Sequence, residues 1–122
     1  MTGELDSAQV RAAAWDIVQL DARRAVVDRP YLEFLRVADL SAGLYVLEAG
    51  ATDRQVPHTE DEIYAVIGGS GRLRMGGDDV AVGPGTIAFV AAGVEHRFHD
   101  ISERLTILVV FGPAEGSRAS SA

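Results

Sequence analysis

The sequence contains no cysteine among its 122 residues. This absence excludes disulfide bridges and every metal site that is built on thiolate ligands. A metal ion bound by this chain would therefore need imidazole nitrogens and oxygen atoms as ligands. The absence leaves open the redox state of the compartment in which the protein works.

Long apolar runs and an N-terminal signal pattern are also missing. No run of about 18 apolar residues occurs, so no segment is expected to span a membrane. The first ten residues, MTGELDSAQV, lack the charged-then-apolar layout of a signal peptide. The default expectation is a cytoplasmic protein without a membrane partner.

Positive charge is scarce, because 11 basic residues stand against 18 acidic ones and the formal net charge is −7. Such a chain repels nucleic acid and anionic membranes unless it carries a local basic patch. The densest basic group, Arg23, Arg24 and Arg29, lies among acidic residues and is predicted to be a solvated face. We therefore expect no nucleic-acid partner.

The residues that are present indicate one folded domain with a helical N-terminal arm. Hydrophobic residues make up 48% of the chain, which is enough to form a core without disulfide or metal cross-links. Ser7 is predicted to cap a short helix over residues 8–15, and a second helical or turn segment is predicted over residues 21–27. Pro30 ends this segment, so residues 1–30 form a partly helical arm.

From residue 31 onward, short segments bounded by Gly, Pro or Asp predict β-strands. Gly68 and Gly69 are predicted to form a hairpin turn between two of them. The pattern is typical of an antiparallel sandwich or barrel over residues 31–113, followed by a disordered tail over residues 114–122. The predicted strands are Tyr31–Val37, Gly43–Glu48, Ile63–Ile67, Gly71–Met75, Asp79–Val82, Thr86–Val90, Glu95–Asp100 and Arg104–Phe111.

Two histidines and one carboxylate form the candidate metal site. His58 and Glu62 are four residues apart, so both point to one face if they lie on a strand without a bulge. His96 lies on a later strand, and a closed sheet can bring it to the same point. Imidazole and carboxylate suit Zn, Fe, Mn, Ni or Cu. The alternative is an ordinary surface histidine beside Pro57 and a solvated acid at position 62.

Neighbouring residues receive predictions from the same strand alternation. Tyr64 and Phe98 share faces with the candidate ligands and are predicted to be pocket walls. His99 is an odd number of residues from His96 and is expected to face the other way. Glu60 is a reserve carboxylate in a segment that is predicted to be an exposed turn.

The spacing of these residues resembles that of the cupins, whose first motif is G-x5-H-x-H-x3-4-E-x6-G and whose second is G-x5-P-x-G-x2-H-x3-N. His58, Glu62 and Gly69 match the first motif. Gly85, Gly93 and His96 match the second. The resemblance implies an all-β jelly-roll barrel, or double-stranded β-helix, with a divalent metal held inside by His58, Glu62 and His96.

The chain departs from the family pattern at the first histidine position, which is Val56. On a regular strand Val56 would share the inward face of His58 without donating a ligand. Gln55 is the candidate additional ligand, provided that the strand bulges.

Two functions are consistent with this resemblance. The leading hypothesis is a small metal-binding cupin that holds a small polar molecule inside the barrel, as a dioxygenase or an isomerase. The alternative is a non-catalytic binding or sensor cupin without metal chemistry, which the valine at position 56 favours. A homodimer is expected, built from the Tyr31–Val37 strand or the N-terminal arm, because an open sheet edge needs cover.

Overall fold

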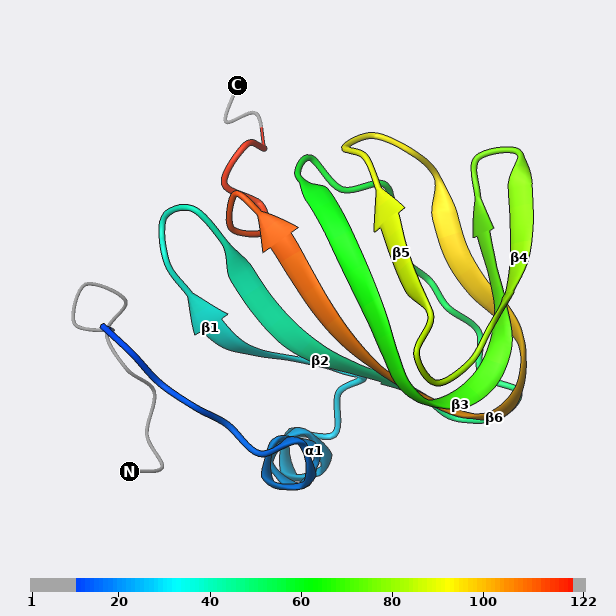
Figure 1. Cartoon of the computed structure of the whole chain (residues 1–122), viewed down its shortest axis with the longest axis horizontal. Helices are drawn as coiled ribbons and strands as arrows, with labels where there is room; N and C mark the ends of the chain where they lie inside the picture. The colour runs from blue at the N-terminus through cyan, green and yellow to red at the C-terminus, as the bar shows by residue number, and fades with distance from the viewer. Residues whose placement is uncertain (1–10, 120–122) are drawn as a thin grey trace.

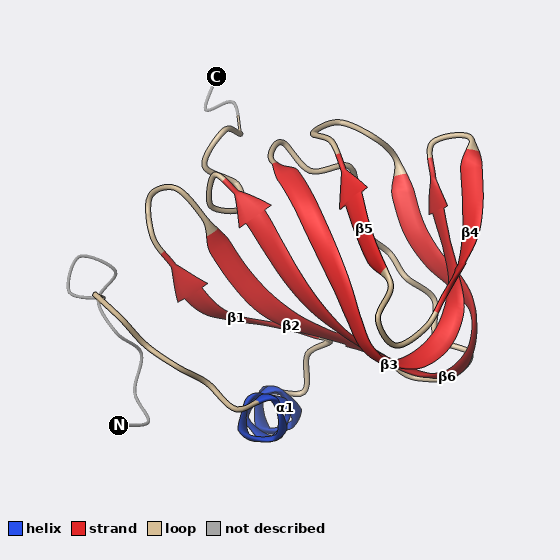
Figure 2. Ribbon diagram, in the orientation of Figure 1, coloured by secondary structure: helices blue, strands red, loops and turns tan. Residues whose placement is uncertain are grey.

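Six antiparallel strands and one helix make up the computed structural model, which describes residues 11–119. The sheet order is β1-β2-β6-β3-β4, and β5 pairs with β3 (Figures 1 and 2). The prediction of an all-β antiparallel fold is therefore confirmed. The elements are α1 (Ile17–Val27), β1 (Tyr31–Arg36), β2 (Ser41–Leu47), β3 (Asp61–Met75), β4 (Asp78–Val82), β5 (Ile87–Val90) and β6 (His96–Gly112).

The two longest strands, β3 and β6, pair with each other from end to end and form the spine of the sheet. The predicted hairpin turn at Gly68 and Gly69 is wrong, because β3 continues through both residues with shifts of register. A side chain at Gly69, whose φ is +91°, would bring a Cβ to 2.0 Å from the carbonyl oxygen of Arg104 on β6. Glycine thus lets the strand bend against its partner without ending.

Alternation along these strands builds the inner core. Buried and more exposed residues alternate along the second half of β6, where Leu105, Ile107, Val109 and Phe111 point inward. Tyr45 and Leu47 of β2 belong to the same buried cluster. The inner face of the curved sheet is therefore apolar, and the few polar side chains on it stand out.

Helix α1 covers the outer face of β1 and β2 (Figure 1). It begins where the Asp16 carboxylate accepts hydrogen bonds from the N–H groups of Val18 and Gln19, and Leu20 packs on Leu44 and Val46. The predicted segment 21–27 is thus helical and begins earlier, at residue 17. Of the helix predicted over residues 8–15, residues 11–15 are not helical and the rest lie outside the described residues.

Arg24 differs from its prediction as part of a solvated face. It is buried, and its guanidinium donates to Asp21 at 2.8 Å and to the carbonyl of Arg29 at 3.0 Å.

Within residues 11–119, no helix is both long and apolar enough to cross a membrane.

Hydrogen bonds tie the C-terminal segment after β6 to β2 and to the loop before β3. Glu60 is only 1% exposed, so the prediction that it lies in an exposed turn is wrong. Its carboxylate accepts hydrogen bonds from the N–H groups of Gly116 at 2.6 Å and Arg118 at 2.9 Å, and the hydroxyl of Ser41 accepts one from the N–H of Glu115. Residues 114–119 therefore form an anchored segment where a disordered tail was expected, and residues 120–122 lie outside the described part.

Candidate metal centre

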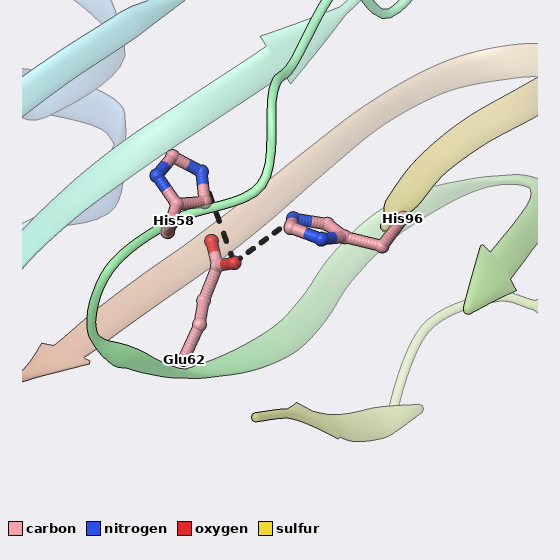
Figure 3. A group of neighbouring side chains, drawn as sticks. All are labelled: His58, Glu62 and His96. Atoms are coloured by element: carbon pink, nitrogen blue, oxygen red, sulfur yellow. Dashed lines mark ion pairs between the residues drawn. The ribbon is translucent and has the colours of Figure 1, made fainter. Parts of the chain in front are cut away.

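Three side chains from different parts of the chain converge inside the barrel (Figure 3). Glu62 lies near the start of β3, His96 is the first residue of β6, and His58 comes from the loop before β3. One ligand atom from each lies within 4.8 Å of the other two. Oε1 of Glu62 lies 3.1 Å from Nε2 of His96 and 4.0 Å from Nε2 of His58. The two histidines and the carboxylate that the sequence singled out are therefore brought together.

Strand alternation explains two of the three positions. Glu62, Tyr64 and Val66 are the buried residues at the start of β3, and His96 and Phe98 are their counterparts on β6. His99 faces the other way, as predicted, and its ring lies 2.9 Å from the Asp79 carboxylate outside the barrel.

The geometry around the two imidazoles directs Nε2 of each ring toward Glu62. Nδ1 of His96 lies 2.9 Å from the carbonyl oxygen of Val94 and must donate its proton there. Nδ1 of His58 lies 3.6 Å from the carboxylate of Glu115, on the anchored C-terminal segment. A hydrogen-bonded outer partner, as the Val94 carbonyl is for His96, orients a metal-binding histidine.

The polar atoms at the centre of this group lack hydrogen bonds. Within residues 11–119, both oxygens of Glu62 and Nε2 of His96 are buried and make no hydrogen bond of good geometry, although Oε1 and Nε2 face each other as an ion pair at 3.1 Å. Each such atom costs about 1–3 kcal/mol if it stays unpaired. A divalent cation bound by imidazole and carboxylate would satisfy all three at once, so the residues present fit a transition metal.

The charge on His96 is coupled to this arrangement. Burial by itself lowers the pKa of His96, but the Glu62 carboxylate and the Val94 carbonyl outweigh burial and raise the pKa above its ordinary value. A metal ion that binds His96 must displace the proton of its charged imidazole. Metal affinity is therefore expected to fall as the pH falls through the raised pKa of His96.

The loop over residues 51–60 places Gln55 at the site and Val56 outside it. This loop is not a strand, so the alternation of strand side chains does not apply to it. The prediction that Val56 shares the inward face of His58 is wrong, because Val56 is 70% exposed. Oε1 of Gln55 accepts a hydrogen bond from the Tyr64 hydroxyl at 2.9 Å and lies 3.2 Å from Nε2 of His58.

Asp53 is the residue of the site that sequence reasoning missed. It is buried, and its carboxylate accepts hydrogen bonds from the Tyr45 hydroxyl at 2.6 Å, the Phe98 N–H at 2.8 Å and the Gln55 side-chain amide at 2.8 Å. These bonds tie the loop that carries His58 to β2 and β6. No sequence signal separates Asp53 from the other acids of the loops.

A cavity of about 350 Å³ adjoins the three side chains. Tyr64 and Phe98 lie beneath the site, with ring centroids 4.9 Å apart, and neither lines this cavity, so they do not take the predicted role of walls here. The lining residues are Pro30, Tyr31, Tyr45, Leu47, Thr52, Arg54, Gln55, His58, Glu62, Val109, Phe111 and Glu115. Half of the lining residues are aromatic or aliphatic, and the polar half includes the candidate ligands His58 and Glu62.

Comparisons with known proteins concern the family and the fold of the chain. A family model described as a cupin domain matches residues 43–111. The protein SCO3923 of Streptomyces coelicolor is 47% identical over 102 residues, which cover 84% of this chain and 97% of that protein.

Two solved structures show the same fold. TT1209 from Thermus thermophilus matches with a TM-score of 0.67 and 22% identity over 83% of this chain and 97% of that chain. A cupin with a double-stranded β-helix fold from Methanocaldococcus jannaschii (mj0764) matches with a TM-score of 0.62 and 17% identity, over 68% of this chain and 78% of that one. At these identities the likeness concerns the fold alone.

Proposed function

Because this chain belongs to the cupin family, we propose that it is a small metal-binding cupin in which His58, Glu62 and His96 hold one divalent transition metal. The observation that carries the proposal is the set of buried polar atoms on Glu62 and His96 that lack hydrogen bonds, with the imidazole of His58 beside them. Zn, Fe, Mn, Ni and Cu all accept this donor set. The adjoining cavity holds the small molecule on which the protein acts.

Three protein ligands leave coordination positions open, so a bound metal would supply Lewis-acid or redox chemistry to a molecule in the cavity. The residues of the chain orient and shield that position. The carbonyl of Val94 sets the direction of the His96 ring, while Gln55 fills the side of the site next to His58. Tyr64 and Phe98 close its floor and exclude water. A dioxygenase or an isomerase is the activity that we propose.

A non-catalytic binding or sensor cupin is the second candidate, and one observation favours it. Val56, at the first histidine position of the family motif, supplies no ligand and points to solvent. Elemental analysis of protein purified without a His-tag or chelating resin tests the choice. One equivalent of a transition metal per chain supports the metal-binding cupin, and metal-free protein that still binds small molecules supports the sensor.

Chelation is expected to lower the melting temperature by about 10 °C or less, without unfolding the protein at room temperature. The barrel has its own apolar core and the full β3–β6 pairing, so the metal is not needed to hold the strands together. Circular dichroism melts with and without EDTA measure the shift. The His96→Ala variant is the control, since its melt should not respond to EDTA. Loss of folded structure on chelation at 25 °C would show a structural metal.

The proposal includes a homodimer, for which the sheet offers a surface other than β1. The outer face of β1 and β2 is covered by α1, whereas four apolar side chains on the outer face of β3 and β5 are exposed. We define these as the β3–β5 patch: Ile63, Ile67, Ile87 and Phe89. Exposed apolar patches mark interaction sites, and a second copy of an apolar patch is complementary to the first.

Light scattering at micromolar concentration is expected to give the mass of a dimer, and Phe89→Glu is expected to give a monomer, because a buried unpaired carboxylate is costly in an apolar interface. Val26→Glu is the matched control, since Val26 is 85% exposed on α1, away from the patch. If Phe89→Glu is still a dimer, the interface lies outside the β3–β5 patch, and the β1 edge is the next candidate. A monomeric wild-type protein would refute the dimer.

A further inference from the structure

The cavity beside the metal centre has aromatic walls from three strands. Tyr31 of β1, Tyr45 of β2 and Phe111 of β6 line it, and Phe111 packs edge-on against the ring of His58 with centroids 4.8 Å apart. The Tyr31 ring crosses over Gly43, where a Cβ would come within 2.1 Å of a ring atom. Glycine at position 43 is therefore what allows the Tyr31 ring to reach the cavity wall.

The charges around this cavity are predominantly negative. Glu62 and Glu115 both line it. Among the described residues, the one arginine in the lining is Arg54, which is exposed. A neighbouring anion would therefore meet repulsion, whereas a cation would be attracted.

Glu115 is held in place by its backbone. Its N–H donates to the Ser41 hydroxyl at 2.8 Å, and its carbonyl accepts from the guanidinium of Arg36 at 2.7 Å. The next N–H, that of Gly116, donates to the buried Glu60. These bonds fix the backbone at Glu115, whose side chain is 35% exposed and lines the cavity. The carboxylate lies 3.6 Å from Nδ1 of His58, beyond hydrogen-bond distance, so it can accept a hydrogen bond from a ligand.

Aromatic rings combined with a carboxylate on an anchored backbone are the chemistry that recognises an organic ammonium group, through cation–π attraction and a charge-assisted hydrogen bond. We propose that this cavity binds a compact amine with an apolar or aromatic body, whose ammonium group faces Glu115 among the rings of Tyr31, Tyr45 and Phe111. This inference rests on the proposed small-molecule site, but it does not require the metal to be bound.

Three probes of the same size that differ in charge test the proposal: benzylamine, benzyl alcohol and benzoate. Isothermal titration calorimetry of the full chain at pH 7, first after EDTA treatment and dialysis, is expected to show the tightest binding for benzylamine and the weakest for benzoate. Glu115→Gln is expected to weaken benzylamine about tenfold while leaving benzyl alcohol within about twofold. Glu103→Gln, an exposed residue of β6 outside the cavity lining, is the matched control and should retain the preference for the amine.

Tyr31→Leu supplies an independent arm, because it removes an aromatic face and leaves Glu115 in place. It is expected to reduce benzylamine binding more than benzyl alcohol binding. Equal binding of the three probes, or an unchanged preference in Glu115→Gln, would overturn the proposal. Tighter binding of benzoate would also overturn it, and would point to the second cavity, where Arg74 and Arg97 line the other side of His96.

The same titration after addition of Zn²⁺ separates this inference from the proposed function. If metal binds and the amine preference is absent, only the ligand class is wrong. If the amine binds and no metal does, the metal-binding proposal fails and the cavity assignment stands.

Discussion

Replacing His96 by alanine is expected to weaken Zn²⁺ binding by about a hundredfold or more. Loss of an outer partner of a metal ligand already costs about 10–100-fold in affinity, so loss of a direct ligand should reach at least the upper end. The side chain of His96 is 1% exposed, as is that of Glu62. Water therefore cannot readily take the place of the His96 imidazole. Competition with a chromophoric chelator, together with elemental analysis, measures the change.

His99→Ala is the matched control for this experiment. His99 lies three residues away on the same strand but outside the barrel, in contact with Asp79. Its removal should leave Zn²⁺ affinity within about twofold of the wild-type value, since it touches neither ligand nor cavity. Near-normal metal content in His96→Ala, or equal losses in both variants, would contradict the assignment of His96 as a ligand.

Variants at positions 55 and 56 test the geometry of the loop. The family motif would lead one to expect that Val56→His adds a ligand and tightens binding, but the side chain at position 56 points to solvent. Val56→His is therefore expected to leave the affinity unchanged, whereas Gln55→Ala is expected to weaken it, because the Gln55 amide oxygen lies 3.2 Å from Nε2 of His58. A gain in affinity with Val56→His would mean that the loop lies in register with a strand.

Replacing Asp53 by alanine is expected to lower the free energy of unfolding by about 3–5 kcal/mol, because two buried donors and one half-buried donor lose their acceptor and each unpaired donor costs about 1–3 kcal/mol. The donors are the Tyr45 hydroxyl, the Phe98 N–H and the Gln55 amide. Urea unfolding followed by fluorescence or circular dichroism measures the loss. The same variant should also bind Zn²⁺ more weakly, because the loop that carries His58 is released.

Asp39→Ala serves as the control for charge and composition, since Asp39 is exposed. It should change the free energy of unfolding by less than about 0.5 kcal/mol, as is usual for surface substitutions. If Asp53→Ala is as stable as Asp39→Ala, the carboxylate of Asp53 does not hold the loop.

His96→Ala and Asp53→Ala test two different roles in the site, metal ligation and support of the loop. His96 contributes a ligand atom and little to the strands around it, so its loss should appear in metal affinity. Asp53 contributes no ligand atom but fixes the loop, so its loss should appear in stability first. If His96→Ala and Asp53→Ala changed Zn²⁺ affinity and the free energy of unfolding in the same proportion, this division of roles would be wrong.

Sequence alone determined the features that depend on local periodicity and composition. Strand alternation predicted that Glu62 and Tyr64 share one face and that His96 and Phe98 share another, because the side-chain period of a strand is two. It also placed His99 outside. The absence of cysteine by itself restricted the candidate ligands to imidazole and oxygen.

Tertiary structure decided the features that depend on partners distant in the chain. Asp53 and Phe98 are 45 residues apart, and Glu60 and Gly116 are 56 apart, so no local pattern could show that these carboxylates are buried and bonded. The loop over residues 51–60 has no fixed period, and only its contacts with Tyr45, Tyr64 and Phe98 turn Gln55 inward and leave Val56 in solvent. Local rules hold where backbone geometry sets the direction of each side chain, and where it does not, the surrounding fold sets that direction.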